Sequence, residues 1–302
     1  MVFSSLVFIS IFLPLVFLCY QLLPGIRLKN GWLLIASLVF YAYGEPVCIF
    51  LLIFSAFMNY LFGRGVAGGK KRWVLVLAVF FNLGVLIVFK YATFLMREAA
   101  ALTGIAFPIP AVPFPIGVSF FTFQALSYVI DVYRGDTKAQ KNFLTVLLYI
   151  SLFPQLVAGP IVRYRDVEKE LSARCASAQD IAWGLNRFIA GLAKKVLIAN
   201  SAGVIVDTLF QADRAEIFVL SAWLGAIAYM LQIYFDFSGY SDMAIGMGRM
   251  FGFHFNENFR EPYQSSGVRE FWRRWHISLS TWFREYLYIP LGGNRKSFVR
   301  TL

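Results

Sequence analysis

The stretch FWRRWHISLSTWFREYLYIPLGGNR (residues 271–295) places one of only two histidines in the chain among aromatic residues and arginines. At helical spacing its side chains fall into a polar stripe and an aromatic stripe about 100° apart. The polar stripe is Arg269, Arg273, His276, Ser280 and Arg284, and the aromatic stripe is Trp272, Trp275, Leu279, Trp282 and Tyr286. This pattern predicts an amphipathic helix at a membrane surface, with its Trp and Tyr rings at the level of the lipid headgroups. We expect His276 to face a cavity that other segments enclose.

The composition of the whole chain excludes an ordinary soluble globule. Of the 302 residues, 59% are hydrophobic, 18% are aromatic and 15% are charged, which indicates a polytopic integral membrane protein. The net charge of +11 comes from basic residues spread through short connections between apolar runs, as is typical of cytoplasmic loops. We therefore expect membrane lipid and no nucleic acid as a partner. Cys19, Cys48 and Cys175 have no metal-ligand or redox spacing, so we expect no metal site and no bound cofactor.

Apolar runs of spanning or nearly spanning length recur along the chain. They are Val2–Leu23, Gly31–Tyr43, Pro46–Phe62, Trp73–Phe89, Ile116–Tyr133, Phe143–Val157, Ile181–Phe210 and Phe218–Met250. The first run lacks a basic region before it and a cleavage signature after it, so we expect a retained first helix. The second and third runs are separated by two residues, which is compatible with two crossings or with one tight hairpin. The basic loops 24–30 and 63–72 are predicted to be cytoplasmic, with the segment near 91–114 on the outside.

Four segments depart from simple spans. Residues 107–115 contain four prolines, which excludes a helix, and the short run Phe143–Val157 ends in Pro154, which favours a re-entrant segment. Residues 163–180 carry charges of both signs and predict a soluble surface loop. The run Ile181–Phe210 carries Arg187, Lys194 and Lys195, so it either lies partly in the interface or extends its lysines to water. We find no internal repeat and no long linker, and we expect a single domain over residues 1–302.

The titratable residues within apolar surroundings are the candidates for chemistry. His276 can relay a proton near neutral pH, or it can be an interfacial histidine bonded to a backbone group. For His254 a structural role is favoured, because no polar stripe accompanies it. Asp236 and Asp242 either line a polar cavity, or they fix a helix break at Ser238-Gly239 and pair with arginines such as Arg249.

Two short patterns near the C-terminal end have simpler interpretations. Glu270 and Arg274 form an i,i+4 pair in the favourable order and are predicted to support a helix. Gly292-Gly293-Asn294-Arg295 is compatible with an anion-binding nest, but a turn is the preferred interpretation.

Five stretches taken together resemble the membrane-bound O-acyltransferase (MBOAT) family, in the bacterial branch that acetylates alginate and related polysaccharides. They are PIGVSFFTFQALSYVIDVYRG (115–135), LFPQLVAGPIVRY (152–164), GLAKKVLIAN (191–200), YFDFSGYSDMAIG (234–246) and NFREPYQSSGVREFWRRWHISLSTWFREYLYIPLGGNR (258–295). The resemblance runs along nearly the whole chain, and its last stretch is the most specific. The ending IPLGGNR is more similar to polysaccharide acetylases than to teichoic-acid D-alanyl transferases, which share the Trp-His core.

The resemblance implies an all-α, multi-pass protein of the bacterial inner membrane, with re-entrant and interfacial helices around a tunnel. An acyl donor, acetyl-CoA or a related thioester, would deliver acetyl groups from the cytoplasm toward hydroxyls of an exported polysaccharide, with periplasmic acetyltransferase proteins as partners. His276 would be the catalytic residue, with a supporting role in polarising the acyl carbonyl or relaying the proton. The residues expected to line the tunnel are Trp272, Trp275, Asp236, Asp242, Ser280 and Arg273.

Alternative functions stay open at this point. Family members carry a second histidine on a later helix, and no histidine follows His276 here, so we expect a C-terminally incomplete member. A catalytically incomplete membrane scaffold is then an alternative, as is acyl transfer to peptidoglycan or teichoic acid. A transporter would be expected to show inverted-repeat symmetry around intramembrane carboxylates, and the sequence shows no such repeat.

Overall fold

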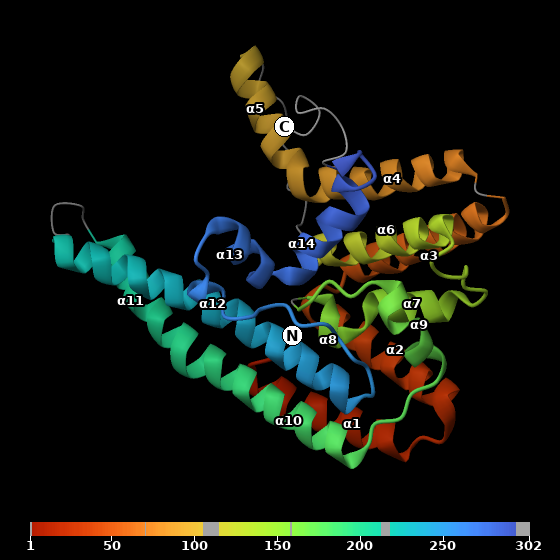
Figure 1. The fold of residues 1–302 in the computed structure, drawn as a ribbon, viewed down its shortest axis with the longest axis horizontal. Coiled ribbons are helices and arrows are strands. Elements are labelled where there is room, and N and C mark those ends of the chain that lie inside the picture. The colour runs from red at the N-terminus through yellow and green to blue at the C-terminus, as the bar shows by residue number, and fades with distance from the viewer. Residues whose placement is uncertain (1, 70, 105–114, 158, 213–217, 294–302) are drawn as a thin grey trace. The chain divides into compact units, whose positions relative to one another are not determined.

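The computed structural model describes residues 2–69, 71–104, 115–157, 159–212 and 218–293, and every regular element in these ranges is helical (Figure 1). The chain divides into two compact units. The first comprises Met1–Leu22, Ala158–Pro160 and Arg174–Leu302, and the second comprises Leu23–Val157 and Ile161–Ala173. The single domain over residues 1–302 stays a prediction.

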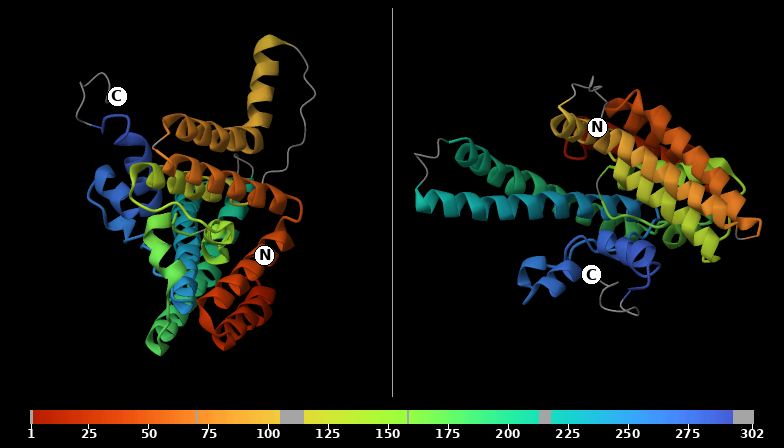
Figure 2. Two further views of the ribbon diagram at one scale, coloured as in Figure 1. Left: turned by 90° about the vertical axis from the view of Figure 1, so that its right-hand side faces the viewer. Right: turned by 90° about the horizontal axis from the view of Figure 1, so that it is seen from above.

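The second unit consists of long apolar helices and several shorter helices. Its helices are α2 (Gly25–Gly44), α3 (Cys48–Ala67), α4 (Arg72–Leu86), a π-helical turn (Ile87–Tyr91), α5 (Ala92–Thr103), α6 (Val118–Arg134), α7 (Phe143–Ser151), α8 (Phe153–Leu156) and α9 (Tyr164–Ser172). The two apolar runs separated by Gly44 and Glu45 form two separate helices, α2 and α3. After the π-helical turn, α5 points away from the axis of α4 (Figures 1 and 2).

Helices α3, α4 and α6 contact one another, and polar and small residues occupy their contacts. Asn59 on α3 and Asn82 on α4 are fully buried, and each side-chain amide donates to the other's Oδ1, over 3.2 and 2.8 Å. Each amide also donates to the backbone carbonyl four residues earlier. This reciprocal pair satisfies polar groups that would be costly to leave unpaired between apolar helices.

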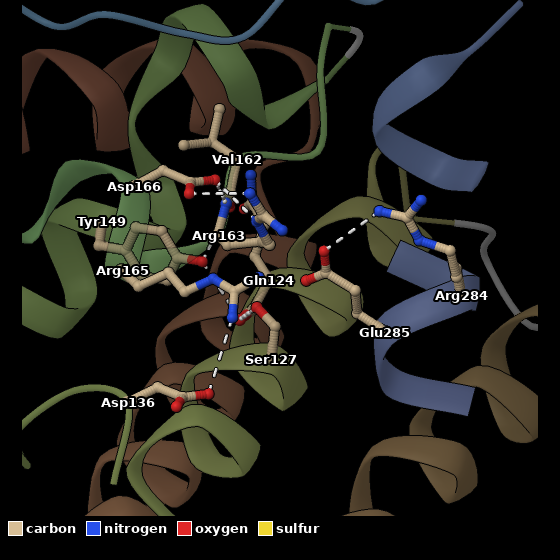
Figure 3. A network of polar contacts seen from close by, with 10 residues as sticks. All are labelled: Gln124, Ser127, Asp136, Tyr149, Val162, Arg163, Arg165, Asp166, Arg284 and Glu285. Carbon is tan, nitrogen blue, oxygen red and sulfur yellow. Dashed lines mark hydrogen bonds and ion pairs between the residues drawn. The ribbon is translucent and has the colours of Figure 1, made fainter. Parts of the chain in front are cut away.

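A polar network ties α6 and α9 to the segments around them (Figure 3). The Tyr149 hydroxyl donates to the Val162 carbonyl over 2.9 Å and lies 3.3 Å from the Gln124 carbonyl. Arg163 Nε lies 2.8 Å from Asp166 at the start of α9.

Residues 164–172 form an amphipathic helix, in which Tyr164, Val167 and Leu171 are buried. The prediction of a surface loop over residues 163–180 is therefore wrong for this part.

The first unit contains α12, the longest single α-helix among the described residues. Its elements are a π-helical turn (Phe8–Phe12), α1 (Leu13–Leu22), α10 (Ala178–Ala193), a π-helical turn (Lys194–Ala199), α11 (Asn200–Gln211), α12 (Val219–Met250), a 3₁₀ turn (Pro262–Gln264), α13 (Val268–Arg274), α14 (Ile277–Phe283) and a π-helical turn (Arg284–Tyr288). The continuous run from α10 to α11 lies alongside α12 (Figures 1 and 2).

Glycines allow the backbones of α10 and α12 to come into direct contact. A Cβ on Gly184 would lie 2.5 Å from the Gly246 carbonyl oxygen, and a Cβ on Gly191 would lie 2.6 Å from the Gly239 carbonyl oxygen. Real Cβ atoms do not approach backbone atoms so closely, so both crossings require glycine. The small residues thus bring α10 and α12 close enough for their side chains to form the polar site described below.

Four helices are long and apolar enough to span a membrane within the described ranges: Cys48–Ala67, Arg72–Thr103, Ala178–Gln211 and Val219–Met250. They overlap four predicted runs, and Arg72–Thr103 extends well beyond the predicted end at Phe89. The first run forms a shorter apolar helix over Phe8–Leu22, and α6 over the predicted span Ile116–Tyr133 has 17 residues. The proline-rich stretch 107–115 falls almost entirely outside the described residues, so its predicted extended conformation is not described.

Candidate functional site

The amphipathic helix predicted from the stripes between Arg269 and Tyr286 is broken at His276. Helix α13 ends at Arg274 and α14 begins at Ile277, with Trp275 extended (φ −99°, ψ 128°) and His276 left-handed (φ 43°, ψ 54°). The interpretation as one amphipathic helix is therefore wrong, and the polar and aromatic stripes do not continue across the break. The spacing that suggested them is local, whereas the break is fixed by contacts with a segment some twenty residues earlier.

That earlier segment is residues 258–260, which lie beside residues 274–277. The Arg260 amide donates to the Arg274 carbonyl, and the Ile277 amide donates to the Asn258 carbonyl, each over 2.9 Å. These two backbone bonds hold the chain extended on both sides of His276. They replace the intrahelical bonds that a continuous helix would have made there.

The fully buried side chain of Asn258 is the centre of the polar contacts at the break. Its Nδ2 donates to the Ser241 hydroxyl on α12 over 3.0 Å. Its Oδ1 lies 3.0 Å from His276 Nδ1, and it accepts from the Ser278 hydroxyl (2.8 Å) and the Ser278 amide (3.3 Å). Sequence patterns did not reveal Asn258, because a lone Asn in a loop-like stretch carries no periodic signal.

His276 is buried among aromatic rings. Its ring centroid lies 4.7 Å from that of Phe237 in an edge-on arrangement and 6.5 Å from that of Phe259 in a stacked one. Only 9% of His276 is exposed, and burial lowers the pKa of its imidazole to about 4 because desolvation disfavours the charged form. The ring is therefore neutral at physiological pH.

A charge cluster beside the break joins α10 and α12. Asp242 is 5% exposed, and its two oxygens each lie 2.6 Å from a cation, Arg187 on one side and Lys194 on the other. The same Arg187 guanidinium lies 2.6 Å from Glu257. Carboxylates and cations alternate in this cluster, which offsets the cost of burying the charges.

The interpretation of Asp236 and Asp242 as residues that break the helix is wrong. Helix α12 runs without interruption through Ser238-Gly239, and Arg249 pairs with Asp180 (2.7 Å). Asp236 pairs instead with Lys195 over 2.7 Å. Lys194 and Lys195, which were expected to extend to water, thus contact carboxylates of α12. Both lysines lie in the π-helical turn after α10, where the backbone departs from regular α-helical geometry.

A cavity of about 340 Å³ lies within this unit, next to the break. Its lining comprises four cations (Arg187, Lys194, Arg260, Arg274), three carboxylates (Asp242, Glu257, Glu261), two aromatic rings (Tyr234, Phe259) and Ser238. Phe259 contributes to the cavity and also packs on His276. The Ser238 hydroxyl, on a residue only 2% exposed, has no hydrogen-bond partner among the described residues.

The predicted site residues do not all gather at this cavity. Asp242 lines it. The predicted residues that are not in its lining are His276, Trp272, Trp275, Arg273, Ser280 and Asp236. Trp272 is half exposed, and the Trp275 ring stacks on Phe271 at 5.5 Å. Ser280 donates its backbone amide to the His276 carbonyl over 3.1 Å.

The smaller predictions around this site have separate outcomes. The Glu270–Arg274 pair is confirmed, with 2.7 Å between Arg274 and the carboxylate, and the Ser266 amide and hydroxyl together with Arg274 lower the pKa of Glu270 to about 2. Gly292 and Gly293 both have positive φ, as turns often require, and Asn294 and Arg295 lie outside the described residues. No group of three or more potential metal ligands occurs within the ranges that the structure describes.

The chain belongs to the membrane-bound O-acyltransferase family, whose model matches residues 138–302. Together with its apolar helices, this membership defines it as a multi-pass membrane protein. The whole chain is 48% identical over 311 residues to the probable alginate O-acetylase AlgI of Pseudomonas aeruginosa. It is 36% identical over 332 residues to a peptidoglycan O-acetyltransferase of Helicobacter pylori, and 31% identical over 180 residues to a teichoic acid D-alanyltransferase of Bacillus subtilis.

These matches differ in how much of each protein they cover. The first two alignments cover 100% and 98% of this chain, but 59% and 62% of the respective relatives. The third covers 58% of this chain and 45% of the relative. The chain thus spans about three fifths of the length of the curated relatives that it matches over its full extent.

Proposed function

We propose that this protein transfers acetyl groups to hydroxyls of an exported polysaccharide such as alginate. One observation carries the proposal: in a member of an O-acyltransferase family, a buried and uncharged imidazole packs on Phe259, and Phe259 lines a polar cavity. The identity of about half of all positions with the probable alginate O-acetylase supports this acceptor class.

The proposed reaction is acyl transfer from a thioester. The hydroxyl oxygen of the acceptor forms a bond to the acyl carbon, the carbon–sulfur bond breaks, and the thiolate leaves. The proton of the hydroxyl passes to a base and finally to the leaving thiolate. We propose acetyl-CoA or a related acyl thioester as the donor, with His276 as the residue of this chain that takes part directly.

We propose further that the cavity beside the break is a section of a tunnel through the bacterial inner membrane. Asp242 would shape it through its pairs with Arg187 and Lys194, and Trp272, Trp275, Arg273, Ser280 and Asp236 would line other sections. Periplasmic acetyltransferase partners would receive the acyl group or present the polysaccharide. The short helices α7 and α8, broken at Leu152, suit the re-entrant segment of this proposal.

Acyl transfer to peptidoglycan or teichoic acid is a competing proposal. It is supported by the similarity to enzymes named for those acceptors.

The test compares His276→Ala with His254→Ala in the protein as its own cells make it. Acetate bound to the exported polysaccharide is measured in a strain that lacks the endogenous gene. We expect His276→Ala to lower acetylation at least tenfold and His254→Ala, which changes an exposed side chain, to leave it unchanged. Wild-type acetylation in His276→Ala would contradict the role of His276, and acetylated peptidoglycan with unmodified polysaccharide would establish the alternative acceptor.

A further inference from the structure

We infer that Asn258 is a positioning residue that holds His276 in the Nδ1–H tautomer, so that Nε2 serves as a hydrogen-bond acceptor and takes the proton of the attacking hydroxyl. The tautomer follows from the contacts alone. The proton-transfer step rests on the proposed acyltransferase function and makes it more specific.

The first step is the orientation of the Asn258 amide group. The backbone amide of Ser278 can only donate, and it lies 3.3 Å from the Asn258 atom that also contacts Ser278 Oγ and His276. An NH₂ group cannot accept from a backbone N–H, so this atom is the carbonyl oxygen Oδ1. The opposite atom then is Nδ2, which donates to the Ser241 hydroxyl.

The second step places the proton on His276. An amide oxygen is a pure acceptor, and His276 Nδ1 lies 3.0 Å from it, so this nitrogen must carry hydrogen to make a favourable contact. An unprotonated Nδ1 would face the oxygen with a second lone pair. The Ser278 hydroxyl is not an equivalent donor for Nδ1, because it lies 3.5 Å from that nitrogen and 2.8 Å from Asn258 Oδ1.

The third step concerns the second ring nitrogen. Within the described residues no carboxylate lies within ion-pair distance of His276, and its ring neighbours are Phe237 and Phe259. Nothing there stabilises an imidazolium, so Nε2 keeps its lone pair. The left-handed backbone at His276 is held by contacts on both sides of the break: Arg260 bonds to Arg274 before it, and Asn258 bonds to Ile277 and Ser278 after it.

A histidine could act in acyl transfer as a proton acceptor or as a hydrogen-bond donor to the acyl carbonyl, and the Nδ1–H tautomer decides between these two roles. An Nε2 with a lone pair can accept the hydroxyl proton while the oxygen–carbon bond forms and the carbon–sulfur bond breaks. It cannot donate a hydrogen bond that polarises the acyl carbonyl. The proton taken by Nε2 would leave with the thiolate or with a second base, which restores the neutral ring.

The decisive measurement is the ¹⁵N spectrum of the imidazole rings in the unmodified protein, labelled with ¹⁵N-histidine in detergent micelles at pH 7. The 302-residue sequence contains only two histidines, and His254→Gln assigns the signals of His276 by difference. We expect a protonated-type signal for Nδ1 and an unprotonated-type signal for Nε2. The reverse pattern, or two protonated-type signals, would overturn the inference.

Two substitutions extend the measurement to Asn258. In Asn258→Asp the carboxylate should keep hydrogen on Nδ1 and add an imidazolium population, whereas Asn258→Leu should abolish the preference for the Nδ1–H tautomer. Asn256→Leu, at an exposed position two residues away, is the matched control and should leave the spectrum unchanged. The wild-type Nδ1–H pattern in Asn258→Leu would overturn the role of Asn258. If Asn258→Leu fails to fold, the spectrum of Asn258→Asp tests the role of Asn258 instead. A spectrum of Asn258→Asp identical to that of the wild type would then overturn that role.

The rate of acyl transfer is the second measurement, and it separates the tautomer of His276 from the proposed acyltransferase function. In a catalytically active form, Asn258→Leu should lower kcat tenfold to a hundredfold with little change in KM, because substrate contacts are retained. Unchanged kcat would overturn the proton-acceptor role of His276. An unmodified protein with the expected spectrum and no acyl transfer would leave the tautomer established and contradict the proposed function instead.

Discussion

At the scale of single residues, strained backbone is concentrated in one short region. The described residues contain two non-glycine positions with positive φ, Glu261 at 46° and His276 at 43°. Glu261 lines the cavity, and His276 packs on Phe259, which lines it as well. Such conformations cost of order 1–3 kcal/mol each and persist where surrounding contacts hold them. Their coincidence with the cavity supports the assignment of this region as the functional site.

The neutral His276 makes stability depend on pH. The unfolded chain binds a proton at this ring below about pH 6.5, while the folded chain does so only below about pH 4. Between these values protonation favours the unfolded state, so the free energy of unfolding should fall as the pH is lowered from about 6.5 to about 4. The total loss is at most about 3.5 kcal/mol, and no change is expected from this group above pH 6.5.

The measurement is the thermal unfolding midpoint in detergent between pH 4 and 7.5. His276→Asn should remove most of this pH dependence in the window, while His254→Asn should retain it. A slope that is the same in all three proteins would show that His276 is not the group responsible.

The sequence predicted the importance of His276 but not its conformation. Spacing at i, i+3 and i+4 favoured an unbroken helix, because such spacing reports only local geometry. The break depends on Asn258, eighteen residues earlier, and on Ser241 in α12. No single-sequence pattern encodes these long-range hydrogen bonds.

At the scale of elements, the glycine contacts between α10 and α12 make a clear stability prediction. In Gly246→Ala the new Cβ would lie 2.5 Å from the Gly184 carbonyl oxygen and 2.7 Å from the Phe188 amide nitrogen. These backbone atoms cannot move away from the new Cβ unless the two helices separate. We therefore expect the free energy of unfolding to fall by about 1–3 kcal/mol. The measurement is the unfolding midpoint in detergent.

Gly84→Ala is the matched control in another membrane helix. A Cβ at Gly84 meets nothing within 4 Å, so this change should be neutral or slightly stabilising. Equal stability of the two variants would mean that α10 and α12 are not in backbone contact.

The Asn59–Asn82 pair predicts a coupled response to substitution. Asn59→Leu leaves one amide of Asn82 without its reciprocal partner, so this single change should cost about 1–2 kcal/mol. The double substitution to Leu should cost less than the sum of the single ones by about 0.5–1.5 kcal/mol. A double-mutant cycle on unfolding in detergent measures this coupling, and strict additivity would exclude the reciprocal bond.

Element positions were largely predictable, and their ends were not. Hydropathy located the four long apolar helices, because burial in lipid requires long apolar runs. It underestimated α2, where polar residues at Arg27, Lys29 and Asn30 continue the helix before the apolar run. It also missed α9, whose one buried face is stabilised by packing within its own unit.

At the scale of the whole molecule, the distribution of basic residues predicts the orientation in the membrane. The connection between α3 and α4 follows Arg64 and contains Lys71, so it should lie on the cytoplasmic side. In a background without native cysteines, Ala67→Cys should react with an impermeant maleimide only after the membrane is opened. Leu102→Cys, which is 86% exposed near the end of α5, should react in intact spheroplasts. The opposite pattern would invert the predicted topology.

Family membership was the most predictable property of the molecule, because motifs such as those at 234–246 and 258–295 are long and specific. The charge cluster was only half predictable. Asp242 was identified as unusual for its position, whereas its partners Arg187 and Lys194 belong to a run whose charges were attributed to the membrane interface. Partner choice across two helices depends on which faces meet, and one sequence does not give that information.

The glycine contacts between α10 and α12 have a consequence for register. Gly184 and Gly191 are seven residues apart, and so are their partners Gly246 and Gly239. Sliding one helix by seven residues, about 10 Å, would bring Gly191 opposite Gly246 and restore one close crossing. Glycines alone therefore tolerate more than one alignment. The slide would separate Asp242 from Lys194 and Asp236 from Lys195, leaving charges unpaired at membrane depth. The ion pairs thus select the single alignment in which α12 presents Ser241 to Asn258.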